Sequence, residues 1–327
     1  MKAQVARTVR IFVAAVFGLL IAALFVVTGI NSRRTSIPAG DGAKLDHTSC
    51  QQCHQDAWRE WEASMHARAW RDATVQASFG TFGFDRKCQS CHAAEPTLAS
   101  PDAEPVLRVA DVESGVNCLT CHQLPDGGVA ARRTIANAPC RPTESPLFMS
   151  SASCGVCHVA SQKDWSASSF ASKRQECQTC HMPMLAGTGK GRSHAFLGGH
   201  DDATVRSGVR MEAARDSEQV VVRLANETTG HNFPGERHHR MLIVQIIERA
   251  ADGEIVLSQQ DTIKGVTPFR GEASADKIRA GQTVEVRFPV VKDAVLADVS
   301  LLYKLYPWYT DAESLLVSRA VVELNEK

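Results

Sequence analysis

The sequence predicts three parts: an N-terminal transmembrane helix, a mainly α, loop-rich domain, and a C-terminal antiparallel β-sandwich. Three observations predict this organisation: one uncharged apolar run near the N-terminus, five copies of the pentapeptide C-x-x-C-H, and runs of β-branched residues toward the C-terminus. The expected boundaries are residues 1–34 for a tail and anchor, 35–46 for a linker, 47–200 for the loop-rich domain, 201–217 for a second linker and 218–327 for the β domain.

The apolar run covers residues 11–30 and follows three basic residues. Twenty helical residues at about 1.5 Å each span about 30 Å, the thickness of a bilayer core. The run is longer than the apolar region of a cleaved signal peptide, and no clear A-x-A cleavage site follows it, so we expect an uncleaved anchor. The positive-inside rule then places residues 1–10 in the cytoplasm.

The five C-x-x-C-H pentapeptides lie between residues 50 and 181. Their cysteines are Cys50, Cys53, Cys88, Cys91, Cys118, Cys121, Cys154, Cys157, Cys177 and Cys180, and their histidines are His54, His92, His122, His158 and His181. Two thiols one helical turn apart can bond to the two vinyl groups of one porphyrin, and the adjacent histidine then binds the iron from the proximal side. A zinc or disulfide interpretation leaves the histidine unexplained five times. The sequence therefore predicts five covalently bound haem c groups.

Haem c is attached on the outer face of the membrane, so we expect an inner-membrane, single-pass protein whose haem and β domains lie in the periplasm. Five of the 36 basic residues precede residue 35, where no acidic residue occurs. The rest of the chain therefore carries 31 basic and 36 acidic residues, and no basic stripe for nucleic acid is left. The pentahaem domain should have short helices and long loops, because the porphyrins supply much of its buried apolar surface.

Residues 55–71 have the pattern of one helix with a broad apolar face. That face carries Trp58, Trp61, Met65, His66 and Trp70. A histidine on such a face is usually a core residue, but several irons here need a sixth ligand. We therefore expect His66 to be a distal ligand. Two attachment sites only 23 residues apart, ending at His158 and His181, should bring two haems close together.

Seven histidines remain outside the motifs. His194 and His200 lie in a glycine-containing loop beyond the last motif, where they are either distal ligands or solvated loop residues. His231 lies in the turn 227–235, from which it can reach a haem of the neighbouring domain, and His47 is the fifth candidate. A fifth haem without a histidine would be five-coordinate and open to a small molecule such as nitric oxide.

Three further residues fall outside this ligand set. His238 and His239, beside Arg237 and Arg240, are expected to form a surface or propionate-binding cluster. Cys140 lies outside the motifs and is expected to be an inert thiol, with iron ligation as the alternative.

From about residue 218, short β-branched runs separated by Asp-Gly and Ala-Gly turns predict the β-sandwich.

Several segments resemble the multihaem cytochromes of the cytochrome c-554 and hydroxylamine oxidoreductase group. They are residues 114–122 (SGVNCLTCH), 177–183 (CQTCHMP), the helix with Trp61 and His66, the loop 193–200 (SHAFLGGH) and the turn 229–235 (TGHNFPG). The resemblance implies bis-histidine, low-spin haems packed in stacked and perpendicular pairs. Relatives that oxidise hydroxylamine use a tyrosine bonded to the catalytic haem. All three tyrosines here lie in the β domain. Relatives that reduce nitrite often have a lysine in place of one motif histidine, whereas all five motifs here end in histidine.

These observations favour an electron carrier without substrate chemistry of its own. It would relay single electrons between a membrane partner, either quinol-linked or another redox protein, and a periplasmic acceptor or donor. One alternative is an oxidoreductase for small nitrogen compounds at one open haem. Another is a cytochrome subunit of a larger redox complex or haem wire.

Overall fold

The computed structural model describes residues 45–81, 83, 86–99, 103–187, 191–235, 240–264 and 277–325. The expected membrane anchor, with His238 and His239, lies outside these residues. Among the helices described, none combines the length and apolar character needed to cross a bilayer. Residues 136–141, which contain Cys140, belong to a different unit from the rest of the described chain.

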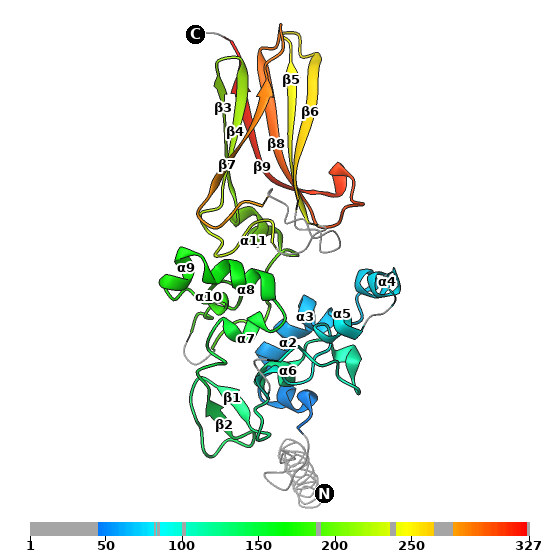
Figure 1. The fold of residues 1–327 in the computed structure, drawn as a ribbon, viewed down its shortest axis with the longest axis vertical. Helices are drawn as coiled ribbons and strands as arrows, with labels where there is room; N and C mark the ends of the chain where they lie inside the picture. Colours follow the sequence, from blue (N-terminus) through cyan, green and yellow to red (C-terminus); the bar gives the residue numbers. More distant parts are fainter. Residues whose placement is uncertain are drawn as a thin grey trace, which may run out of the picture. The chain divides into compact units, whose positions relative to one another are not determined.

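The region that carries the motifs is built from short helices and long loops (Figure 1). Its two longest helices, within the described residues, have nine residues each. The elements are η1 (His47–Gln52), α2 (Gln55–Ala63), α3 (Met65–Arg68), α4 (Ala73–Thr81), α5 (Arg86–Ser90), η2 (Thr97–Ala99), η3 (Val112–Ser114), α6 (Cys118–His122), β1 (Val129–Ala131), β2 (Pro142–Glu144), α7 (Ala152–Gly155), α8 (Val159–Ser166), α9 (Ser169–Ser172) and α10 (Cys177–His181). Trp61, Phe79 and Leu98 are its large buried apolar side chains among those described. So little protein core is what a region packed around covalent cofactors should have.

The helix expected at residues 55–71 is two helices. Ser64 has extended backbone angles (φ −80°, ψ 164°) and ends α2. Its side chain then accepts a hydrogen bond from the Ala67 amide, which begins α3. Because the chain turns at this residue, His66 does not share a face with the tryptophans of α2. The single-helix prediction was wrong because Ser64 is a better N-cap than an interior helix residue.

The C-terminal region contains two antiparallel sheets (Figure 1). One has the order β3-β4-β7 and the other β6-β5-β8-β9, formed by β3 (Arg210–Asp216), β4 (Gln219–Ala225), β5 (Met241–Arg249), β6 (Ile255–Lys264), β7 (Thr283–Pro289), β8 (Leu296–Lys304) and β9 (Leu315–Glu323). Side chains of both sheets share one hydrophobic core that includes Leu224, Ile246 and Leu301. The alternation of apolar and polar residues thus predicts the antiparallel pairing found here.

The β region begins earlier than the sequence indicates. Helix α11 (Asp202–Ser207) and strand β3 occupy the segment expected to be a linker at residues 201–217. Strand β3 is an edge strand whose residues are alternately exposed and partly buried, and it contains four charged side chains. One side of an edge strand's backbone is unpaired, and charged side chains on such a strand discourage another chain from pairing with it. Its charge therefore hid it from a search for apolar runs.

Glu248 on β5 is a buried acid in this core, with 0% of its surface exposed. Its Oε2 accepts a hydrogen bond from the Val291 amide at 2.9 Å, whereas Oε1 has no partner. Burial raises the pKa of Glu248, and the Val291 bond opposes this only in part. A raised folded-state pKa means that the group stabilises the fold at acid pH, and that this contribution is lost as the pH rises through the folded pKa.

Replacing Glu248 by glutamine should remove this pH dependence. We expect the free energy of unfolding to rise by roughly 1–3 kcal/mol at about pH 8 and to change little at about pH 5, because the variant holds no buried charge. Denaturant titrations at both pH values measure the effect. The same change at Glu254, an exposed residue of the next turn, is the control and should leave the pH dependence intact. Equal pH dependence in wild type and Glu248→Gln would contradict the assignment.

Candidate haem-binding sites

The C-x-x-C-H motifs lie on or beside single helical turns. Helices α6 and α10 each coincide with one motif. In the first and fourth motifs, the histidine amide donates to the carbonyl of the first cysteine four residues earlier, at 2.9 Å for both His54 and His158. All eleven cysteines of the chain are unbridged thiols. One turn therefore presents two thiols and an imidazole together, as covalent haem attachment requires.

Backbone carbonyls fix the orientation of several histidine rings. Among the motif histidines, Nδ1 of His92 is 2.7 Å from the Ala69 carbonyl oxygen and Nδ1 of His122 is 2.9 Å from that of Ala130. His181 makes the same contact with the Leu197 carbonyl. A ring that donates from Nδ1 to a carbonyl keeps its lone pair on Nε2, and this arrangement is common among metal-binding histidines.

Two histidines outside the motifs are oriented in the same way. Nδ1 of His194 lies 3.0 Å from the Arg192 carbonyl oxygen, and Nδ1 of His231 lies 3.0 Å from that of Asn232. Both therefore leave Nε2 available as a metal ligand.

Three histidines outside the motifs face a motif histidine. The ring centres are 6.3 Å apart for His122 and His194, 6.2 Å for His181 and His231, and 6.2 Å for His66 and His158. Two metal–imidazole bonds of about 2 Å, plus roughly 1 Å from each nitrogen to its ring centre, give roughly 6 Å. Each pair thus has the spacing of two axial ligands of one iron, so the donor set fits haem.

Burial keeps these rings neutral. It lowers the pKa of His66 to about 3, with further contributions from His158 and His181. It also lowers the pKa of His122 to about 4, although the hydrogen bond to Ala130 opposes the shift. Burial likewise lowers the pKa of His194. Neutral imidazole is the form that binds a metal, so His66, His122 and His194 are in that form at neutral pH.

The other two expected distal ligands have different neighbours. His47 is buried, with its ring stacked on Trp58 at 5.8 Å and its Nδ1 3.3–3.4 Å from carboxylate oxygens of Asp46 and Asp111. His200 contacts Tyr306 of the β region, at 6.4 Å between ring centres. Within the described part of the chain, neither ring is paired with a motif histidine.

Thiols of different motifs touch one another. Cys50 of the first motif is hydrogen-bonded to Cys118 of the third. Two further contacts join the fourth motif to its neighbours: Cys154 with Cys177, and Cys157 with Cys91. The Cys121 thiol of the third motif also acts electrostatically on both cysteines of the fourth. The five motifs thus form one connected group in which the fourth adjoins the second, third and fifth.

Glu60 holds the loop that carries His194. Its Oε2 accepts hydrogen bonds from the His194 amide at 2.6 Å and from the Ser193 hydroxyl at 3.2 Å. The two segments lie 134 residues apart in sequence, so no local pattern marks Glu60. Its position on α2 nevertheless links the first motif to the expected distal ligand of the third.

Replacing Glu60 by alanine should loosen His194 and give a high-spin fraction in the ferric spectrum. A hydrogen bond to a charged group contributes roughly 1.5–3 kcal/mol, enough to release the loop for part of the time. Glu60→Gln keeps an acceptor oxygen and should stay low-spin. The control, Glu62→Ala, removes an exposed carboxylate from the same helix. A low-spin Glu60→Ala protein would show that the contact does not position His194.

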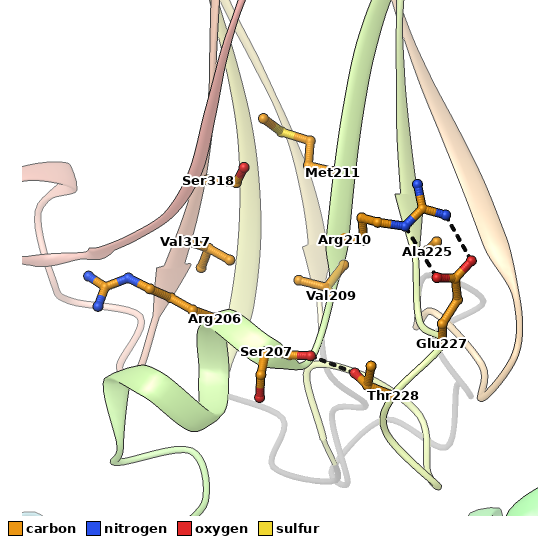
Figure 2. Close-up of a pocket in the computed structure, with 10 residues that line it drawn as sticks. All are labelled: Arg206, Ser207, Val209, Arg210, Met211, Ala225, Glu227, Thr228, Val317 and Ser318. Carbon is orange, nitrogen blue, oxygen red and sulfur yellow. Dashed lines mark hydrogen bonds and ion pairs between the residues drawn. The ribbon is translucent and has the colours of Figure 1, made fainter.

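A surface cavity of about 330 Å³ lies in the β region (Figure 2). Its lining includes the ion pair between Arg210 and Glu227, at 2.8 Å, and the hydrogen bond from Thr228 to the Ser207 carbonyl. None of its lining residues is a cysteine or a histidine. The expected haem ligands therefore lie elsewhere.

Comparison with known proteins gives one family match and one extensive structural match. Residues 49–123 match the family model of cytochrome c554 and c-prime. A penta-heme cytochrome c552 from Thermochromatium tepidum has a similar structure, with a TM-score of 0.63 and 19% identity over 86% of this chain and 98% of that one. A DUF3823 family protein from Bacteroides ovatus matches with a TM-score of 0.21 and 13% identity, over 36% of this chain and 54% of that one. No curated protein matches the sequence.

These findings agree with the geometry of the motifs. The family match covers the first three motifs, and the structural match extends across most of the chain, including the β region. Both findings support covalently bound haem c and, with it, a role in electron transfer or redox chemistry. The chain therefore has the fold of a penta-heme c-type cytochrome with a β-rich C-terminal region, and its first three motifs match the family of cytochrome c554 and c-prime.

Proposed function

We propose that the chain binds five haem c groups and relays single electrons among them. Each motif supplies two thioether cysteines and a proximal histidine. The geometry supports His66 as the distal ligand opposite His158, His194 opposite His122, and His231 opposite His181. A bound haem c supplies an iron that gains and loses one electron.

The observation that carries this proposal is the connected group of motifs. Thiol contacts join the first motif to the third, and the fourth to the second and fifth. Attachment points in contact hold the cofactor edges near one another, and short edge-to-edge gaps favour electron transfer. Paired, backbone-anchored imidazoles add rigidity, which limits the structural change that accompanies each transfer.

We further propose that residues 11–30 anchor the protein in the inner membrane and that the haem and β regions lie in the periplasm. The apolar run and the preceding basic residues support this orientation. A membrane quinol-linked or other redox protein is the proposed partner on one side, with a periplasmic acceptor or donor on the other. The surplus of acidic residues beyond residue 34 favours a partner with a positively charged docking surface.

Three measurements on the full chain test this function. The pyridine haemochrome assay should give five haems per chain. Stopped-flow reduction should reach all haems through a single entry point. Fractionation should place the protein in the inner membrane, with protease access only from the periplasmic side. Fewer than five haems, or haems that reduce independently at unrelated rates, would contradict the relay.

A second candidate function, small-ligand chemistry at one open haem, rests on His54. In the described part of the chain, no ring contact involves His54, and His47, the fifth expected distal ligand, is held by Asp46, Asp111 and Trp58. Nitric oxide or cyanide should then change the spectrum of about one haem in five. If neither ligand changes the spectrum, no haem is open and electron relay remains as the proposed function. A monodisperse monomer on calibrated light scattering would argue against the haem-wire alternative.

A further inference from the structure

Arg240, the residue before β5, carries a partly buried guanidinium that nothing in the described chain neutralises. Its Nε is fully buried and has no hydrogen-bond partner. The Nε atoms of Arg108 and Arg192 are equally unpartnered, but the terminal nitrogens of those arginines donate to backbone carbonyls of Ala94, Gly115, Gln178 and Met182 among others. Among the residues described, Arg240 makes no such bond and no ion pair. It therefore differs from arginines that only hold the backbone.

Two loops of the expected distal ligands hold this guanidinium closely. A Cβ atom added to Gly199 would lie 2.5 Å from Nη1 of Arg240, and one added to Gly235 would lie 3.6 Å from it. Gly199 belongs to the loop 193–200 and Gly235 ends the turn that carries His231. The absence of side chains at both glycines allows the guanidinium to enter between these loops.

The same loop connects Arg240 to the fifth motif. The Leu197 carbonyl oxygen contacts Nδ1 of His181, and a Cβ on Gly198 would lie 3.9 Å from that nitrogen. The next residue, Gly199, is the one in contact with Arg240. The three consecutive residues 197–199 therefore lie between the His181 imidazole and the Arg240 guanidinium. His231 lies opposite that imidazole.

One carboxylate, that of Asp72, acts electrostatically on His200 and Tyr306, but in the described chain it forms no ion pair with Arg240. The Tyr303 hydroxyl donates to the Gly199 carbonyl at 3.1 Å, and burial raises the pKa of Tyr303, so it remains protonated. Burial lowers the pKa of His200, and Arg240 lowers it further, so that ring is neutral. A desolvated cation without a counter-charge is costly. The site therefore calls for an anion, and a carboxylate matches the fork of a guanidinium.

We propose that Arg240 binds a propionate carboxylate of the haem attached to Cys177 and Cys180. This inference rests on the proposed attachment of haem to the fifth motif. The haem carries two carboxylates. Two guanidinium groups without an ion pair lie near that motif in the described chain, and the terminal nitrogens of Arg192 already donate to the Gln178 and Met182 carbonyls, whereas those of Arg240 have no such bond. By neutralising one carboxylate, Arg240 favours the reduced, more electron-rich state of this haem, and it keeps the carboxylate ionised throughout the neutral pH range.

The test is a redox titration of the full-length holoprotein carrying Arg240→Gln. In a His231→Ala background, the fifth haem should become high-spin, so its EPR signal can be followed separately from the others. We expect its oxidised-to-reduced ratio at a fixed potential to rise about tenfold, equivalent to a fall of about 59 mV for a one-electron couple. Its potential should also become pH-dependent between about pH 5 and pH 7, because the carboxylate now titrates there.

Two variants make the outcome decisive. Arg223→Gln removes an equally positive, exposed side chain from β4, where it pairs with Glu285, and should shift nothing. Arg240→Lys keeps the charge but not the fork, so it should give a smaller shift. If Arg240→Gln does not mature, Arg240→Met, which also removes the charge, takes its place: a fall in potential supports the proposal, and an unchanged potential overturns it. A shift without new pH dependence, or a shift in a low-spin haem only, also overturns it. Haem counting separates these outcomes from failure of the proposed function, because a fifth motif that never binds haem gives four haems in wild type as well.

Discussion

Replacing His231 by alanine should convert one haem in five to the high-spin state without loss of covalent haem. The ring of His231 faces that of His181 at 6.2 Å with an interplanar angle of 15°, and a carbonyl holds its Nδ1. Removal of this imidazole leaves the iron with its proximal ligand alone, while Cys177 and Cys180 keep the porphyrin attached. EPR and the ferric absorption spectrum measure the change, and mass spectrometry confirms the haem number.

The adjacent residue offers a matched control. Asn232→Ala keeps the backbone carbonyl and alters the same turn, so it should leave the spin state of every haem as it is in the wild type. An unchanged spectrum in His231→Ala would show that His231 is not a ligand and that the β region does not complete this site. A high-spin fraction in both variants would indicate a general disturbance of the turn.

Replacing Gly115 by alanine should displace the segment that carries His66. Gly115 has a φ of +62°, and a Cβ there would collide with the His66 carbonyl oxygen and lie 2.8 Å from that of Ala67. The His66 carbonyl also accepts a hydrogen bond from the Val116 amide at 2.9 Å. Backbone atoms cannot yield as a side chain can, and Gly115, with φ 62° and ψ −137°, lies in a backbone region that essentially only glycine adopts. We therefore expect a loss of about 2–5 kcal/mol from backbone strain and overpacking together. Denaturant unfolding measures this loss.

Gly127 separates these two causes. Its φ is +78°, but a Cβ there would meet nothing within 4 Å. Gly127→Ala should therefore cost only the strain, about 1–2 kcal/mol, and should leave the haem spectrum unchanged. Gly115→Ala should in addition give a high-spin fraction at the haem of the fourth motif, for which His66 is the proposed distal ligand opposite His158. Equal effects in the two variants would show that the contact with α3 does not matter.

Which segments pair with which is the information that a single sequence does not contain. The motifs fall in the sequence at intervals of 23 to 38 residues, yet the thiol of Cys50 meets that of Cys118, and Cys91 meets Cys157. Glu60 and Arg240 carry no local signal because their neighbours come from segments distant in sequence. Only folding brings these groups together. Reasoning from local spacing missed Glu60, and it placed Arg240 only beside an expected surface or propionate-binding cluster of His238 and His239.

The helix expected at residues 55–71 shows how a local pattern misleads. Its apolar spacing is real, but Ser64 ends α2 and starts a new helix, so His66 turns away from Trp58 and Trp61. The ring instead contacts Phe196 at 4.3 Å and faces His158. The expectation of iron ligation thus remains a proposal, with a different surrounding from the one that the tryptophans indicated.

The sequence by itself predicted the cofactor class, its attachment residues and the β-rich nature of the C-terminal region. These depend on contiguous chemistry: two thiols and an imidazole within five residues, and side chains that alternate along a strand. The tertiary structure alone decided which histidine faces which motif, which motifs adjoin, and where an unpaired cation lies beside the fifth. Those relations depend on the path of the chain through space, because a distal histidine must approach the iron from the face opposite the proximal histidine, and it comes from a distant segment of the chain.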